Sequence, residues 1–255
     1  PLTVSFGEEE YIDGVTIDHR TFYQNLIETD AMPSTSQASH AAFAEQYDQA
    51  AADDEEVVVI TISSKLSGTY QSAMIAATGR SSVYVVDSEN ASVGCGILVG
   101  LALRYLRDGM TASAIAEKLQ EDKKKIVVIA LLDTLEYLKR GGRISKAAAF
   151  AGGLLNIKPV ISIADGEIQL LGKARGSKMG NNLLAQQIQK VGGIDFTKPV
   201  LLGYTGLSDV LLQKYIEDSS YLWSASLDAV RYVSIGSVIG AHAGPGAIAV
   251  AFFRK

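Results

Sequence analysis

The sequence contains few of the residues that mark disulfide-linked, membrane-spanning or nucleic-acid-binding proteins. Its only cysteine among 255 residues is Cys95, so no disulfide can form within the chain, and we expect a reducing compartment. No apolar run reaches the roughly 18 residues of a membrane span, and no secretory signal opens the chain. The net charge of −5 argues against broad nucleic-acid binding. We therefore expect a cytoplasmic protein that binds no nucleic acid and makes only transient membrane contact.

Several catalytic and cofactor motifs are also missing. There is no GxSxG nucleophile elbow and no Walker motif. The three histidines, His19, His40 and His242, do not lie at a metal-binding spacing. Gly94, Gly96 and Gly100 follow the pattern G-x-G-x3-G rather than the dinucleotide fingerprint. The sequence thus predicts neither a metal nor a cofactor, and small residues at 94–100 would let a helix approach a neighbour closely.

The first half of the chain alternates between β-branched apolar runs and helical patterns. The runs are VVVITI (57–62), SVYVVDS (82–88) and KIVVIALL (125–132). The first reads as a strand covered on both faces, the second as a strand and the third as a buried strand. Helices are expected between them and also after Asp18, which can cap a helix. This alternation predicts an α/β domain with a parallel sheet.

The regular alternation of strands and helices ends after Leu132. Residues 159–175 read as a hairpin with Asp165-Gly166 as its two-residue turn. Strands are expected at PVLLGY, VRYVSI and AIAVAFF, with helices at about 178–191 and 209–218. A mixed sheet is therefore predicted, and the charged run EDKKK suggests a boundary that divides the chain into domains 1–123 and 124–255.

Five polar segments are expected to meet at the carboxyl ends of strands, where open α/β sheets bind ligands. They are 34–39, 63–69, 87–92, 141–145 and 239–247. The stretch SSKLSGT, at 63–69, carries four hydroxyls where a helix cap needs one. Hydroxyls together with Arg143 and His242 suit a small anion such as a carboxylate. Each segment also has a plainer reading as a helix cap, a tight turn or a surface residue.

Six segments, in the order in which they occur, closely resemble the DegV family of bacterial fatty-acid-binding proteins. The likeness covers the chain from Pro1 to Lys255. The segments are TSQAS, ISSKLSGTYQSA, VYVVDSENASVGCG, LLDTLEYLKRGGRIS, LLNIKPVISIADGEIQLLGKARGSK and HAGPGAIAVAFF.

The resemblance implies two α/β domains that bury a long-chain fatty acid between them, in a carrier that is not an enzyme. It implies that hydroxyls, an arginine and a histidine hold the carboxylate. At the matching positions these are Thr35, Ser36, Ser63 or Ser64, Arg143 and His242. Gly94 and Gly96, with Ile97, Leu98, Leu101 and Ala102, are candidates for the wall of the acyl tail, with ordinary helix packing as the alternative.

The resemblance further implies a partner in some members. There the carrier presents the acyl carboxylate to a separate fatty acid kinase, and a basic stretch matching Lys173 and Arg175 contributes to docking; a solvated face is the plainer reading. The family pattern begins with a further strand and an Asp-Ser-Thr loop before Pro1, so we expect the true start to lie upstream. Ala38 replaces a commoner proline, which removes no donor.

Two other classes of function stay open from the sequence. One is a serine-dependent acyl hydrolase or transferase that uses Ser64 with His242, although nothing local ties them into a triad. The other is a phosphate-ester binding protein that uses the glycine-rich segments.

Overall fold

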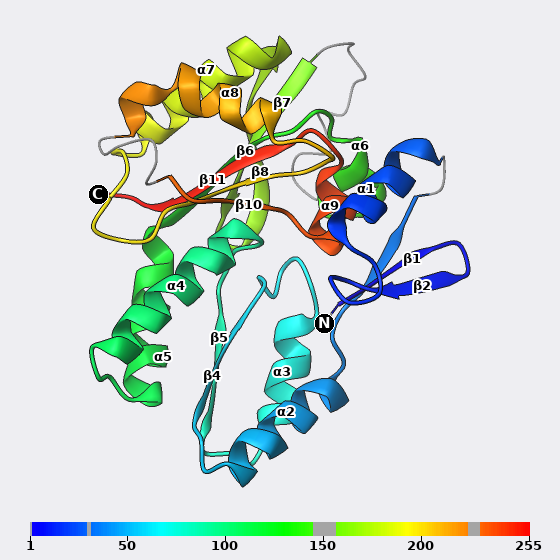
Figure 1. Cartoon of the computed structure of the whole chain (residues 1–255). Helices are drawn as coiled ribbons and strands as arrows, with labels where there is room; N and C mark the ends of the chain where they lie inside the picture. Colours follow the sequence, from blue (N-terminus) through cyan, green and yellow to red (C-terminus); the bar gives the residue numbers. More distant parts are fainter. Residues whose placement is uncertain (1, 30–31, 145–156, 224–229) are drawn as a thin grey trace.

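The computed structural model describes residues 2–29, 32–144, 157–223 and 230–255. Within these ranges the strands form three sheets, with the orders β4-β5, β10-β9-β11-β6-β7-β8 and β2-β1-β3. The two-stranded sheet is parallel and the six-stranded sheet is mixed, so the protein has the predicted α/β fold (Figure 1). No described helix is long and apolar enough to cross a bilayer.

The parallel sheet pairs β4 (Val57–Thr61) with β5 (Val83–Asp87). Helices α2 (His40–Ala52) and α3 (Thr69–Ala77) lie on one side of it, and α4 (Val93–Arg107) and α5 (Ala112–Asp122) on the other (Figure 1). The expectation of a strand buried on both faces was wrong for most of β4, because Val57–Ile60 are only half-buried. A sheet of two strands has no inner strand, so both of its strands are edges.

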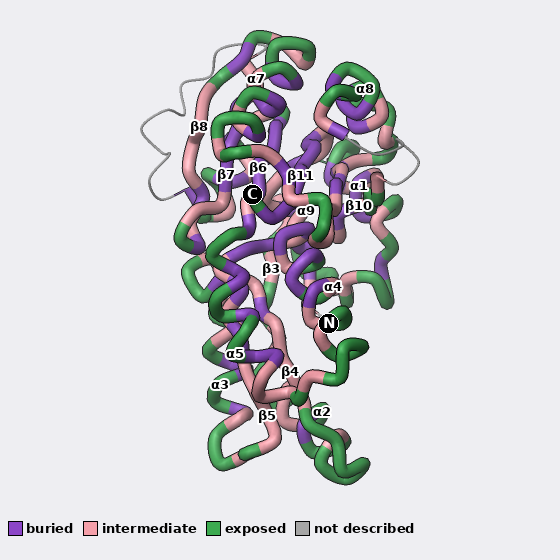
Figure 2. Tube along the Cα trace, turned by 90° about the vertical axis from the view of Figure 1, so that its left-hand side faces the viewer, coloured by how far each residue is buried: buried purple, intermediate pink, exposed green. Residues whose placement is uncertain are grey.

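The six-stranded sheet holds the best-buried part of the protein. It consists of β6 (Ile126–Leu131), β7 (Ile157–Ala164), β8 (Glu167–Arg175), β9 (Leu201–Tyr204), β10 (Tyr232–Ser234) and β11 (Ile248–Phe253). Helices α7 (Gly176–Lys190) and α8 (Val210–Asp218) cover one face, and the opposite face turns toward α4 (Figure 1). Every residue of β11, a central strand, is buried (Figure 2).

The predicted hairpin is confirmed. Strands β7 and β8 pair antiparallel, and Asp165 and Gly166 join them with φ of 51° and 76°. Positive φ at both central residues is typical of the type I′ turn, which Asp-Gly favours. The short α6 (Glu136–Arg140) and the one-turn helices η1 (Lys123–Lys125) and η3 (Ser220–Leu222) lie in the connections between these elements.

Two predictions near the ends of the chain were wrong. Residues 34–36, expected in a loop after a strand, are themselves strand β3 (Ser34–Ser36), paired with β1 (Thr3–Phe6), which also pairs with β2 (Glu9–Ile12). Neither β1 nor β2 was predicted, since each has only four residues and neither carries a continuous apolar run. Much of 239–247 is helix rather than loop, because α9 (Ser237–Ala243) runs through it.

The first residues of the chain pack on its last helix. Asp18 caps α1 (His19–Glu28), as predicted, through a 2.7 Å bond from the Thr21 amide. Asp13 accepts bonds from the first amides of α9 at 3.0 and 3.2 Å. A small core joins the two parts: Val4, Ile17, Phe22, Tyr23, Leu26, Val238 and Ala241. Sheet membership changes at η1, near the proposed boundary, but residues 2–29 pack with α9, so the division at 123 stays a prediction.

Candidate functional site

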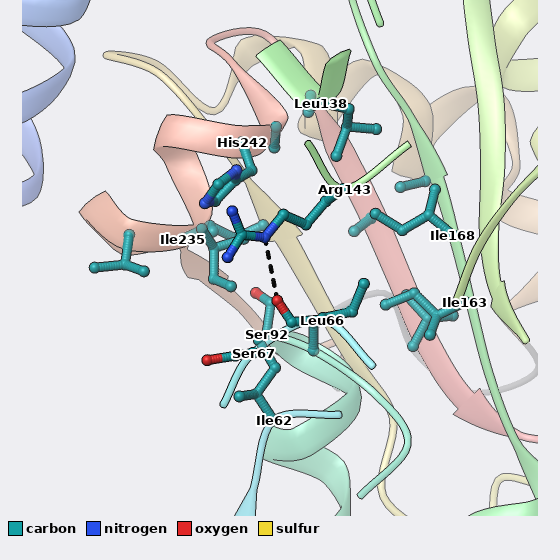
Figure 3. Close-up of a pocket in the computed structure, with 18 of the residues that line it drawn as sticks. Ile62, Leu66, Ser67, Ser92, Leu138, Arg143, Ile163, Ile168, Ile235 and His242 are labelled. Carbon is teal, nitrogen blue, oxygen red and sulfur yellow. Dashed lines mark hydrogen bonds between the residues drawn. The ribbon is translucent and has the colours of Figure 1, made fainter. Parts of the chain in front are cut away.

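A cavity of about 210 Å³ lies between the six-stranded sheet, strand β3, helix α9 and the start of helix α4. Its polar end is formed by side chains of β3, α9 and the segment after α6. Its apolar wall comes from the mixed sheet, where Ile163 and Ile168 lie (Figure 3). The lining includes Thr35, Ser36, Gln37, Leu66, Ser67, Ser92, Leu138, Arg143, Ile161, Ile163, Ile168, Ile235, His242 and Ala249.

Three of the predicted ligand residues come together at the polar end. The Thr35 hydroxyl lies 3.1 Å from Nε2 of His242, although the two are 207 positions apart in the chain. Arg143 reaches the same space and donates from Nε to the Leu66 carbonyl at 3.2 Å (Figure 3). A second bond of 2.6 Å runs from its guanidinium to the Gly141 carbonyl. These bonds hold the arginine beside the histidine and still leave guanidinium donors for a ligand.

The environment of His242 keeps its ring neutral near pH 7. Burial, with a contribution from the charge of Arg143, lowers the pKa of His242 to about 4. Its Nδ1 is buried and has no hydrogen-bond partner among the described residues. A buried polar atom without a partner is unfavourable. A carboxylate beside Arg143 would offset the positive charge that, after burial, disfavours protonation of this ring.

Hydroxyls that the sequence analysis did not single out line the cavity beside Leu66. Ser67 and Ser92 both lie there (Figure 3). Ser92 has φ 51° and ψ −122°, a region that non-glycine residues rarely occupy, and such strain concentrates at functional sites. It precedes α4, whose first turn carries no acidic residue. The partial positive charge of that helix end favours an anion in the cavity.

Ser63 and Ser64 lie outside the cavity lining. The Ser63 side chain is fully buried and donates at 2.8 Å to the Gly166 carbonyl in the β7–β8 turn. Ser64 is exposed, and its amide donates to the Asp87 carboxylate at 3.2 Å. The geometry therefore gives this stretch a structural part, and only Ser67 brings a hydroxyl to the cavity.

The glycines of α4 act in packing. A Cβ on Gly94 would come within 2.6 Å of the Val128 side chain, and one on Gly96 within 3.0 Å of Leu201. Close approach of the helix, which the sequence analysis offered as the alternative, is confirmed, and neither glycine lines the cavity. Ile97, Leu98 and Leu101 are buried core residues outside the lining, as is the half-buried Ala102. The apolar wall instead comes from alternate residues of the sheet: Val128, Ala130, Ile161, Ile163, Ile168 and Ala249.

Lys173 and Arg175, the predicted docking residues, lie at the end of β8. Both are exposed, and neither lines the cavity. They therefore belong to the outer surface, separate from the polar end that Thr35, Arg143 and His242 form.

The arrangement suits anion binding better than hydrolysis. Ser64 does not lie with His242 in the cavity, and the partner of Nε2 is Thr35 instead. Nδ1 of His242 has no carboxylate among the described residues to orient it, whereas a triad needs one. The described residues also contain no cluster of His, Cys, Asp and Glu side chains that could hold a metal.

Comparison with known proteins identifies the family. The profile described as "Uncharacterised protein, DegV family" matches residues 1–255. A DegV domain-containing protein of Caldanaerobacter subterraneus subsp. tengcongensis is 34% identical over 100% of this chain and 90% of its own length. A relative from Deinococcus radiodurans is also 34% identical, over 98% and 89%. The chain therefore belongs to the DegV family.

Solved structures agree in fold. A DegV family protein from Thermus thermophilus, described as binding fatty acid, matches with a TM-score of 0.89 at 32% identity, over 100% of this chain and 91% of that one. A stearic acid-binding protein from Eubacterium ventriosum matches with a TM-score of 0.88 at 31% identity, over 100% and 90%.

Proposed function

We propose that this protein binds a long-chain fatty acid, with its tail in the apolar cavity and its carboxylate between Thr35, Arg143 and His242. The observation that carries the proposal is the convergence of these three side chains at one end of an apolar cavity. The relatives of known structure that are described as binding fatty acid support it.

Burial of the acyl chain in this apolar cavity would favour binding. A sixteen-carbon acid has about fourteen methylene groups, each worth roughly 0.8 kcal/mol when buried, or about 10 kcal/mol before the cost of ordering the chain. A buried carboxylate without partners would cancel much of this gain. Arg143 offers a fixed positive charge, Thr35 a hydroxyl, and His242 the Nε2 atom that lies beside that hydroxyl.

Native mass spectrometry of the freshly purified protein, followed by organic extraction, tests the proposal. We expect one bound fatty acid per chain, and reloading of the delipidated protein with hexadecanoic acid. Protein that contains no lipid and cannot be loaded would refute the proposal. Labelling by a serine-directed reagent would instead favour the hydrolase, and binding that depends on phosphate but not on acyl length would favour a phosphate-ester binding protein.

The protein would act as a cytoplasmic carrier, not an enzyme, and would present the carboxylate to a separate kinase through Lys173 and Arg175. Both side chains are exposed and lie away from the cavity lining. With such a kinase, Arg175→Glu should reduce acyl phosphate formation while fatty acid affinity stays the same. Arg20→Glu, at another exposed position, is the control. Unchanged phosphorylation by the Arg175 variant would remove that residue from the docking surface.

A further inference from the structure

A second cavity, of about 320 Å³, adjoins the far end of the first. Ser162 and Ile163 of β7 contribute to the lining of both cavities. Ile163 lies across the first cavity from His242, on the side away from the polar end (Figure 3). An acyl chain that starts at His242 and follows the apolar wall would therefore reach the boundary between the two cavities.

The pairing of β6 and β7 explains why the sheet is open there. Their ladder ends at the pair Val128–Ile163, although β6 starts at Ile126 and β7 runs on to Ala164. Beyond that pair the two strands no longer bond to each other. The second cavity is lined from both faces of the sheet at this point: Ile163 shares its face with Val128 and the acyl cavity, whereas Ser162 shares the opposite face with Ile129.

The second cavity has a different chemistry from the acyl wall. Three cationic side chains line it, Lys123, Lys124 and Arg254, against two carboxylates, Glu89 and Asp165. Lys123 is buried and occupied, because it donates to the Asp87 carbonyl at 2.8 Å and lies 2.9 Å from the Glu89 carboxylate.

Two of these cations remain available to a ligand. Lys124 and Arg254 are exposed, and neither forms an ion pair within the described ranges. The cavity thus has a surplus of positive charge near the hydroxyl-bearing Ser162. An anionic group that reached it would be attracted and would remain partly hydrated.

We propose that the second cavity is a distal subsite for the polar far end of an α,ω-difunctional long-chain acid, such as a dicarboxylic acid. The proposal rests on the proposed function, because the first carboxylate would occupy the site at Arg143 and His242. A cavity closed at its far end would reject such a ligand, since it would bury a second carboxylate without partners. Here that group would emerge between the parted strands, near Ser162, Lys124 and Arg254.

The test compares monocarboxylic and dicarboxylic acids of 16, 18 and 20 carbons, bound to the delipidated full chain by calorimetry. For at least one length we expect the diacid to bind within about 10-fold of the monoacid. The double variant K124Q/R254Q should weaken that diacid about 10-fold and leave the monoacid within twofold. Ser162→Val should weaken the diacid about threefold. The control R20Q/R107Q, which removes two exposed charges outside the second cavity, should change neither affinity.

Two outcomes would overturn the proposal while the proposed function stands. One is that every diacid binds more than 100-fold more weakly than the monoacid of equal length. The other is that K124Q/R254Q leaves the diacid unaffected or weakens both ligands equally. Failure of the monoacids themselves to bind would instead refute the proposed function.

Discussion

Two hydroxyl-rich stretches differ in how the fold uses them. In the first, Ser34–Ser36, the chain forms strand β3, and Thr35 points its hydroxyl at His242 in the cavity. In the second, 63–69, which carries four hydroxyls against three, Ser63 bonds to a backbone carbonyl and Ser64 is exposed outside the cavity. The stretch with more hydroxyls thus brings only Ser67 to the cavity.

The difference shows that the number of hydroxyls in a segment is a poor guide to ligand binding. A hydroxyl is available only if the protein does not already use it, and Ser63 is used to join the loop after β4 to the β7–β8 turn. The second stretch contributes mainly through its backbone, because the Leu66 carbonyl holds Arg143 at 3.2 Å.

Removal of Arg143 should have the largest effect on binding. Arg143→Ala takes away the fixed positive charge beside the carboxylate, and hydrogen bonds to charged groups contribute about 1.5–3 kcal/mol. Fatty acid affinity of the delipidated and reloaded protein should fall roughly 10- to 100-fold by calorimetry.

The matched control is Arg140→Ala, three positions earlier. Arg140 bonds to Glu136 on the exposed face of α6 and does not line the cavity. Its loss should leave affinity unchanged. Equal effects of the two variants would mean that general charge, and not the position of Arg143, governs binding.

A direct comparison of the two stretches comes from Thr35→Val and Ser64→Ala. Loss of the Thr35 hydroxyl removes a donor from the carboxylate and should weaken binding by about 1–2 kcal/mol, or roughly 5- to 30-fold. Loss of the Ser64 hydroxyl should have no measurable effect, since Ser64 is exposed and outside the lining. If Ser64→Ala weakened binding more than Thr35→Val in the same titration, Ser64 and not Thr35 would be the donor to the carboxylate.

Ser63→Ala should affect stability and not binding. The variant leaves the buried Gly166 carbonyl without its side-chain donor, which should lower the free energy of unfolding by about 1–2 kcal/mol in denaturant titrations. Fatty acid affinity, measured where the variant is fully folded, should match that of the unchanged protein. A stable variant with weak binding would contradict this assignment.

The sequence predicted local structure better than it predicted the site. The β6 and β11 runs, the Asp165-Gly166 turn and the Asp18 cap are local patterns, and all were identified. Strands β1 and β2 have four residues each and no continuous apolar run, so only their pairing with each other and of β1 with β3 reveals them. The contact between Thr35 and His242 spans 207 positions, and no local pattern encodes it. The resemblance to the DegV family, and not a local pattern, predicted that these two residues share a site.

The pH dependence of binding should show the smallest effect. In the unliganded protein the pKa of His242 lies at about 4 instead of 6.5, because of burial and the charge of Arg143. The unfolded chain therefore takes up a proton near pH 6.5 that the folded protein refuses until about pH 4, so stability should fall as the pH drops through this window.

A bound carboxylate brings negative charge and should raise the pKa of His242, so that the complex holds more protons than the free protein. Fatty acid affinity should then rise a few-fold between pH 7.5 and pH 5.5, and His242→Gln should remove that rise. The ratio of the two affinities at each pH isolates the histidine, because the fatty acid titrates equally in both experiments. A ratio that does not change with pH would mean that Arg143 and Thr35 hold the carboxylate while the histidine stays neutral.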